Sequence, residues 1–156
     1  MKTTIVMLIT MLSLTVARAA NGEGLYNSKE LALSAFGGWV DKHDSTFAPG
    51  AGVSYFLTQN LGVGATTYWE NWDGTFFDNI AGEGYFRWPL RGLPLAPYGV
   101  ASVGYSFETE EGFEALGAGA EWRFNEKWGV FGDVRWQFNN NTDNGVAFRV
   151  GLRLVF

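Results

Sequence analysis

The sequence contains no cysteine and has few charged residues for its length. Without cysteine, neither a disulfide framework nor a Cys-based metal or redox site is possible. Charged residues make up 17% of the 156 positions, against about 25% in a typical soluble domain. The formal net charge is −5. Because a nucleic-acid-binding domain needs a basic face, the sequence predicts no nucleic-acid partner.

Beyond the N-terminal region, no apolar run reaches the length of a membrane-spanning helix. Glycine and aromatic residues are abundant instead, at 21 positions and 17% of the chain. Glycine disfavours a helix by about 1 kcal/mol per position relative to alanine. The aromatic content is also too high for a disordered chain. At this length, one folded domain is expected.

The N-terminal residues have the pattern of a secretory signal. Lys2 provides a positive start, an apolar stretch follows over residues 5–16, and Ala17-Arg18-Ala19 is a small-x-small cleavage site. We therefore expect cleavage after Ala19. We expect a signal peptide at residues 1–19, a short periplasmic segment at residues 20–29 and a barrel domain at residues 30–156.

The rest of the chain alternates between large apolar and smaller or polar residues. The last segment is the clearest, because every second residue from Val146 to Phe156 is large and apolar, while Arg149 and Arg153 share the other face. This period of two is that of a β-strand. Seven earlier segments alternate in the same way. The expected strands cover residues 31–40, 50–57, 61–70, 80–88, 98–108, 116–124, 130–138 and 146–156.

Eight strands of about 9–11 residues match the length that a tilted strand needs to cross hydrocarbon. The connections alternate between short turns and longer polar loops, and the first of these loops spans residues 41–49. Such a pattern predicts an all-β fold, an eight-stranded antiparallel up-and-down transmembrane β-barrel with both termini on the periplasmic side of a bacterial outer membrane. The rival fold is a soluble lipocalin-like barrel, whose apolar face points inward.

The less apolar face of these strands carries charges of both signs, interleaved with glycines. Buried charges must pair, and an eight-stranded barrel has room inside only for side chains. We therefore expect a side-chain-filled lumen rather than a pore. The expected lumen charge network consists of Glu70, Glu83, Arg87, Glu121, Arg123, Asp133, Arg135, Arg149 and Arg153.

On the apolar face, tryptophans fall near strand ends. There they are expected to form an aromatic girdle at the membrane interfaces, although ordinary core residues would show a similar pattern. The girdle residues are Trp39, Trp69, Trp88, Trp122 and Trp136.

The final strand ends in Phe156, with Leu154 and Leu152 at alternate positions before it. This ending resembles the C-terminal signal by which the barrel-assembly machinery recognises outer-membrane proteins. Three further motifs, Pro97-Tyr98 followed by Gly104, the run over residues 117–122 and the run over residues 133–136, resemble the small OmpA-type or opacity-protein-like barrels. The resemblance covers residues 30–156. It implies outer-membrane lipids and lipopolysaccharide as partners, and the assembly machinery during insertion.

Candidates for chemistry are few. His43 is the only histidine and is followed by Asp44 and Ser45 in a predicted outer loop. These residue types suggest a lipid-modifying enzyme, but three adjacent loop residues do not make a triad, which is defined by geometry. The predicted outer loops are also acidic, which suggests either divalent-cation binding or a solvated rim. The acidic residues are Asp41, Asp44, Asp73, Asp78, Glu108, Glu110, Glu111, Glu114 and Asp143.

Together these features favour a non-enzymatic envelope protein with a structural or surface-interaction role, without cofactor or metal. The first alternative is an adhesin or host-factor-binding barrel. The second is a lipid-modifying enzyme that uses His43. The oligomeric state is left open, because barrels of this size form monomers and dimers.

Overall fold

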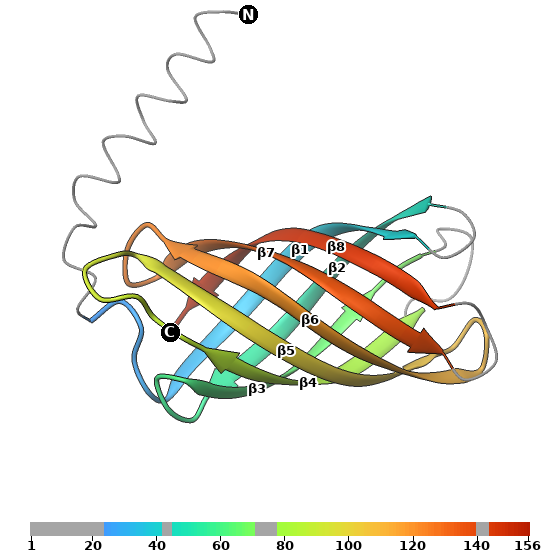
Figure 1. Cartoon of the computed structure of the whole chain (residues 1–156), viewed down its shortest axis with the longest axis horizontal. Helices are drawn as coiled ribbons and strands as arrows, with labels where there is room; N and C mark the ends of the chain where they lie inside the picture. Colours follow the sequence, from blue (N-terminus) through green and yellow to red (C-terminus); the bar gives the residue numbers. More distant parts are fainter. Residues whose placement is uncertain (1–23, 42–44, 71–77, 140–143) are drawn as a thin grey trace, which may run out of the picture.

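In the computed structural model, the described residues are 24–41, 45–70, 78–139 and 144–156. They form a closed barrel in which each strand pairs antiparallel with the next and β1 pairs with β8 (Figure 1). The expected eight-stranded antiparallel barrel is therefore confirmed. The strands are β1 (Glu30–Asp41), β2 (Ser45–Phe56), β3 (Leu61–Tyr68), β4 (Asn79–Arg87), β5 (Leu95–Ser106), β6 (Glu111–Arg123), β7 (Trp128–Asn139) and β8 (Gly145–Val155).

The two ends of the barrel differ. The C-terminus, residues 24–29 and the connections β2–β3, β4–β5 and β6–β7 lie at one end, which we call the terminal end (left in Figure 1). The β5–β6 connection lies at the opposite end, which we call the loop end, as do the last residues of β1, β3 and β7 and the first residues of β2, β4 and β8. No helix among the described residues is long and apolar enough to cross a membrane.

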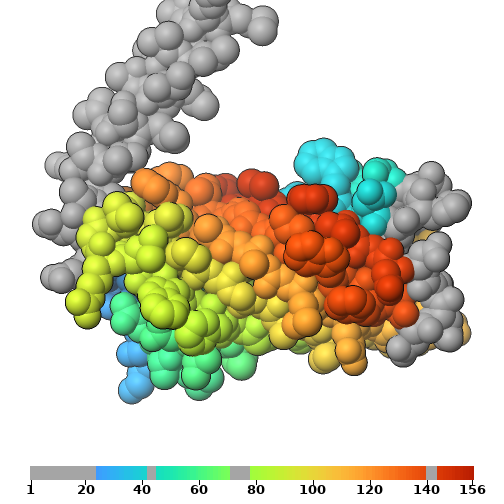
Figure 2. Space-filling model, viewed as in Figure 1, coloured from blue at the N-terminus to red at the C-terminus, as the bar shows by residue number. Residues whose placement is uncertain are grey.

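The outer face of the barrel is apolar. Large outward side chains include Val150, Val103 and Leu116, which are 69%, 65% and 58% exposed. Figure 2 shows this surface where β4 to β7 form the front of the molecule. Since successive strand residues point to opposite faces, the polar residues between these positions turn inward. The soluble lipocalin-like alternative is wrong, because the apolar face lies outside.

Several strand limits differ from the expected ones. The alternation placed the starts of the second and sixth strands at residues 50 and 116, whereas β2 begins at Ser45 and β6 at Glu111. Backbone pairing continues where the apolar alternation stops, as in the pairs Asp41 with Ser45 and Ser106 with Glu111. The loop expected over residues 41–49 is therefore too long, because Asp41 belongs to β1 and residues 45–49 belong to β2.

Pro49, which the expected second strand excluded, lies within β2 and pairs with Gly37 of β1. Its carbonyl oxygen accepts a hydrogen bond from the Trp69 N–H at 2.9 Å. The N–H that proline lacks would point to the same side as this carbonyl oxygen, away from β1 and past the last residue of β3. No hydrogen bond between β1 and β2 is therefore lost at Pro49. The fifth strand also shifts: it covers residues 95–106 rather than 98–108, because Leu95 already pairs with Trp122.

The filled lumen as candidate functional site

Charged side chains inside the barrel gather in two clusters. The terminal cluster, near the terminal end, consists of Glu30, Arg87, Glu121, Arg123 and Arg153, all of them buried. Arg123 contacts both carboxylates, with Nη1 2.9 Å from Glu30 Oε1 and Nε 2.7 Å from Glu121 Oε1. Arg87 lies 3.0 Å from Glu30, and Arg153 lies 2.5 Å from Glu121. Three arginines thus face two carboxylates, an excess of one positive charge.

Tyr26 covers this cluster from the terminal end. Its side chain is 2% exposed, and its ring centroid lies 4.8 Å from Arg87 Cζ and 4.4 Å from Arg123 Cζ. Its hydroxyl donates toward the carbonyl oxygens of Pro94 and Glu121, at 3.0 and 2.8 Å. Burial, and then the Glu121 carboxylate, raise the pKa of the Tyr26 phenol.

The backbone around Tyr26 also binds the cluster. Arg123 Nη1 donates to the carbonyl oxygen of Leu25, and Arg87 Nη2 donates to that of Asn27 at 3.3 Å. The Asn27 N–H in turn donates to Glu30 at 2.5 Å. Part of the predicted short N-terminal segment, residues 24–29, is therefore folded against the barrel end, where its carbonyl oxygens satisfy arginine donors.

The loop cluster lies further toward the loop end and consists of Glu83, Asp133, Arg135 and Arg149, which are also buried. Asp133 accepts hydrogen bonds from Arg149 Nε and Nη2 at 2.9 and 2.8 Å, and from Arg135 Nε at 3.1 Å. Arg135 Nη1 donates to Glu83, and Arg149 Nη1 lies 3.6 Å from the same carboxylate. Two arginines face two carboxylates, so the formal charges balance.

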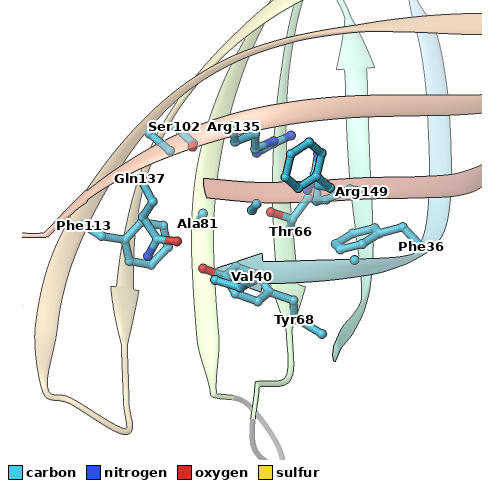
Figure 3. Close-up of a pocket in the computed structure, with 15 residues that line it drawn as sticks. Phe36, Val40, Thr66, Tyr68, Ala81, Ser102, Phe113, Arg135, Gln137 and Arg149 are labelled. Carbon is cyan, nitrogen blue, oxygen red and sulfur yellow. The ribbon is translucent and has the colours of Figure 1, made fainter. Parts of the chain in front are cut away.

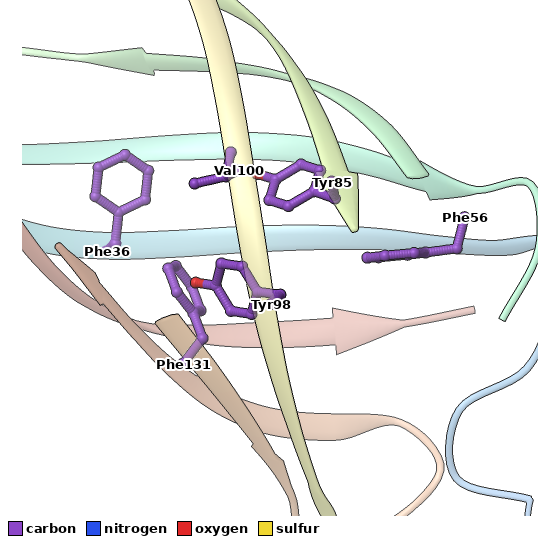
Figure 4. Packing of buried hydrophobic residues seen from close by; sticks show 6 residues of the cluster. All are labelled: Phe36, Phe56, Tyr85, Tyr98, Val100 and Phe131. Carbon is purple, nitrogen blue, oxygen red and sulfur yellow. The ribbon is translucent and has the colours of Figure 1, made fainter. Parts of the chain in front are cut away.

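A layer of five rings and one valine contacts arginines of both clusters. Figure 4 shows its six residues. Tyr98 donates to Asp133 at 2.7 Å, which joins the layer to the loop cluster. Arg149 Cζ lies 4.5 Å from the Phe36 ring centroid, and Arg153 Cζ lies 4.9 Å from that of Phe131. Guanidinium groups therefore stack on the layer from both clusters. This aromatic layer consists of Phe36, Phe56, Tyr85, Tyr98, Val100 and Phe131.

Inward glycines make this filling possible. A Cβ on Gly117 would lie 2.8 Å from Arg135 Cγ, and one on Gly62 would lie 2.7 Å from Phe56 Cδ1. Both distances are too short for carbon atoms that are not bonded. Gly117 thus leaves room for a charged side chain, whereas Gly62 leaves room for a ring.

Eight of the nine residues expected in the charge network belong to the two clusters. Glu70 does not, because β3 ends at Tyr68 and Glu70 lies beyond it, half-buried, with its backbone N–H 3.0 Å from Asp78. Sequence analysis missed Glu30, which we had placed at the domain boundary. The sequence pattern could have indicated that Glu30 faces the lumen, since Glu30 lies two and four residues before the inward residues Ala32 and Ser34.

The expected girdle residues lie near both ends of the barrel. Trp39 and Trp136, near the loop end, are 57% and 54% exposed, and Trp88, at the terminal end, is 63% exposed. Trp122 and Trp69 are half-buried, and Trp69 lies just beyond β3. The sequence analysis did not single out the exposed Trp128 at the start of β7.

The C-terminal residues lie on the outer face. Leu152 and Phe156 are 53% and 68% exposed, and Leu154 is half-buried. The Phe156 N–H donates to the Leu31 carbonyl oxygen at 2.8 Å, which holds the end of the chain against β1. Their role as an assembly signal stays a prediction.

Of the candidates for enzyme chemistry, only Ser45 is described, and it begins β2. The others fall outside the described residues. His43 and Asp44 lie there, as do Asp73 and Asp143 of the acidic loops and the expected signal peptide. In the described part of the chain, no group of three or more His, Asp or Glu side chains is placed to hold a metal ion.

A scan against protein-family models and a search of curated proteins find no match for this sequence. Solved structures do match. The N-terminal β-barrel domain of Pseudomonas aeruginosa OprF matches with a TM-score of 0.68 and 15% identity, over 83% of this chain and 99% of that one. Neisserial surface protein A matches with a TM-score of 0.60 and 12% identity, over 81% and 96%.

This chain has the fold of the small outer-membrane β-barrels. The resemblance found in the sequence is thus confirmed at the level of architecture, and the apolar outer face and the shared fold support the expected outer-membrane location. A structure from the de novo design of transmembrane β-barrels also matches, with a TM-score of 0.65 and 17% identity over 83% of this chain and 97% of that one. Because a designed barrel shares the fold, the fold alone does not assign a role.

Proposed function

We propose that this protein is a non-conducting, non-enzymatic barrel of the bacterial outer membrane, with a structural or surface-interaction role in the envelope. The filled lumen carries the proposal. The terminal cluster, the aromatic layer and the loop cluster succeed one another along the barrel axis. Since an eight-stranded barrel is only wide enough for side chains, this succession leaves no continuous water column.

We infer the partners of the barrel from its outer face. A band of exposed apolar side chains with aromatic residues near both ends suits a hydrocarbon layer with an interface on each side. Outer-membrane lipids and lipopolysaccharide are therefore the proposed partners, with the assembly machinery acting during insertion. In this arrangement the terminal end faces the periplasm.

Conductance tests the proposal directly. The protein, refolded and inserted into a planar lipid bilayer, is expected to give no stable conductance steps. The double variant Phe36→Ala/Phe131→Ala removes two rings that pack 6.3 Å apart in the aromatic layer, and it should produce conductance events. Val150→Ala, on the outer face of the adjacent β8, is the matched control and should remain silent. Steady conductance by the unaltered, folded protein would refute the non-conducting role.

Location is tested separately. In outer-membrane fractions, the folded barrel should migrate faster on a denaturing gel before boiling than after. A soluble periplasmic band without a heat shift would contradict the membrane assignment.

A further inference from the structure

The lumen holds a small cavity beyond the loop cluster. Figure 3 shows Arg135 and Arg149 along one side of this space and Val40 and Tyr68 along the opposite side. Four alanines contribute to the lining: Ala48, Ala81, Ala115 and Ala147. The centres of water-sized molecules can occupy about 30 Å³ of the cavity, and one water needs roughly 10–15 Å³ by this measure. The cavity therefore holds about two or three waters and is too small for a lipid chain.

A larger hollow, which we call the furrow, lies on the outer face across β4, β5 and β6. Its volume is about 610 Å³. Small outward residues of β4 and β5 form its floor, and large exposed side chains of β5, β6 and β7 form its rim. The floor residues are Gly82, Gly84 and Ala101, and the rim residues are Val103, Leu116 and Phe138.

The packing of the barrel does not require the two glycines of the floor. A Cβ on Gly82 would lie 4.0 Å from the Val103 carbonyl oxygen, and a Cβ on Gly84 would lie 3.9 Å from that of Ala101. Both are ordinary contact distances, and the β4–β5 pairing continues through both glycines without a bulge. Glycine in a strand interior weakens the strand and often marks a place where a ligand approaches the backbone.

Glu114 borders the furrow on the side nearest the loop end. It is exposed on the outer face, where it pairs with Val103 of β5 and Phe138 of β7. Every lysine and arginine in the described part of the chain lies in the lumen or at the terminal end. Glu108 and Glu110 in the adjoining β5–β6 connection add negative charge. A cationic group from outside the chain would therefore be attracted to Glu114, and more strongly at the edge of a hydrocarbon layer than in water.

The strand pairing sets how a lipid would lie in the furrow. Two rows of pairing partners cross it, and the second row lies about 7 Å further toward the terminal end. The first row consists of Gly82, Val103 and Glu114, and the second of Gly84, Ala101 and Leu116. A lipid whose headgroup contacts Glu114 would thus lay its chain over the second row, toward the middle of the membrane.

A second copy of the barrel suits the furrow less well than a lipid does. The outer face of a second barrel is also convex, and its described lysines and arginines lie away from the apolar band. Contact between two copies through this face would bring two Glu114 carboxylates together, and like charges in a medium of low dielectric constant repel each other strongly.

We propose that the furrow binds a lipid with a primary ammonium headgroup, whose N–H groups donate to the Glu114 carboxylate while one acyl chain covers Gly84 and Ala101. A charge-assisted hydrogen bond of this kind is stronger than a neutral one. The inference rests on the proposed membrane location, and it adds a selected lipid and a binding site for that lipid to the general contact of the outer face with the membrane.

Methyl NMR of the folded, full barrel in phosphatidylcholine nanodiscs tests the proposal. Phosphatidylethanolamine, added in rising proportion, should shift the methyl signals of Ala101 and Leu116 to saturation. The furrow should prefer it to phosphatidylcholine, which has no ammonium N–H, about tenfold, the worth of a hydrogen bond to a charged group. Phosphatidylglycerol should not bind in preference to phosphatidylcholine. The methyl signal of Ala65, on the outer face of β3, should not saturate with any of these lipids.

Two pairs of variants locate the site. Glu114→Gln should remove the preference for phosphatidylethanolamine, whereas Glu110→Gln, the same change in the β5–β6 connection, should keep it. Ala101→Leu should abolish the shift of Leu116 by filling the furrow. Ala65→Leu fills a separate outer hollow of about 390 Å³, whose lining contains no charged residue, and should leave that shift unchanged. A heat-shift gel establishes that each variant is folded.

Several outcomes would overturn the proposal. Equal affinity for phosphatidylethanolamine and phosphatidylcholine, or an unchanged preference in folded Glu114→Gln, would show that Glu114 selects no headgroup. Tighter binding of lipid A, which carries phosphates and no ammonium group, would replace the ammonium lipid by an anionic one. Shifts that depend on protein concentration would replace the lipid by a second copy. A folded, inserted barrel without any preference would refute this inference alone, whereas a barrel that does not insert would refute the membrane location as well.

Discussion

The two charged clusters of the lumen differ in how they are completed. At the terminal cluster the chain itself closes the structure, because Tyr26 stacks on two arginines and the carbonyl oxygens of Leu25 and Asn27 accept from them. At the loop cluster the charges balance, yet a cavity borders Arg135 and Arg149. Both clusters keep arginine nitrogens without a partner among the described residues: Arg87 Nη1 and Arg153 Nε in the terminal cluster, and Arg135 Nη2 in the loop cluster. The same residue types thus produce one end that the chain itself covers and one end with a small cavity.

The difference follows from the size of the neighbouring side chains. The terminal cluster lies between the Tyr26 ring and the Phe56 ring, whose centroid is 3.8 Å from Arg87 Cζ. The loop cluster has the aromatic layer on one side, and on the other side a cavity that four alanines line together with Tyr68 and Phe113. Where rings cover the arginines, cation–π contacts replace water. Where alanines line the wall, space is left.

The largest effect is expected from Glu121→Gln. Glu121 is fully buried between Arg123 and Arg153, and its neutralisation leaves three arginines with one carboxylate. Removal of one partner of a buried pair costs about 3–5 kcal/mol. Urea unfolding of the barrel in lipid vesicles should show this loss. Glu126→Gln, in the exposed β6–β7 turn, should change stability by less than about 0.5 kcal/mol.

A smaller effect is expected from Asp133→Asn in the loop cluster. The change removes the carboxylate that accepts from Arg135, Arg149 and Tyr98, but the adjoining cavity admits water to part of the site. We expect a loss of about 2–3 kcal/mol in the same unfolding measurement. If Asp133→Asn proves as costly as Glu121→Gln, the two clusters are equally closed and the contrast between them is wrong.

The smallest effect concerns the attachment of residues 24–29. The Tyr26 pKa is higher when the ring is buried than when it is free, so the buried state binds the phenolic proton more tightly. Attachment should therefore be independent of pH below about 10, the ordinary tyrosine pKa, and should weaken as the pH rises further. Tyr26→Phe removes this dependence and weakens attachment by about 0.5–1.5 kcal/mol at neutral pH.

A single fluorophore measures this attachment. Since the chain has no cysteine, Ser28→Cys provides one labelling position on an exposed residue of the segment. Fluorescence anisotropy should fall above about pH 10 when Tyr26 is present, and it should stay constant in the Tyr26→Phe variant. An equal fall in both proteins would show that another group controls the segment.

Alternation along the chain was sufficient to predict the barrel, its strand number and its inward face. A strand has a period of two, so the residues from Val146 to Phe156 by themselves assign the arginines to one side. Strand limits were less predictable, because backbone pairing does not depend on side-chain type. The ladder therefore includes Pro49 and Glu114, which lie outside the expected strands.

By itself, the sequence determined which face of each strand points to the lumen, because the alternation along one strand does not depend on which strands lie next to it. Only the tertiary structure decided which of them meet. Glu30 and Arg123 are 93 residues apart along the chain and bind at 2.9 Å only because the barrel closes and its strands are staggered. Closure also decided that Tyr26 covers one cluster while alanines from several strands leave a cavity beside the other.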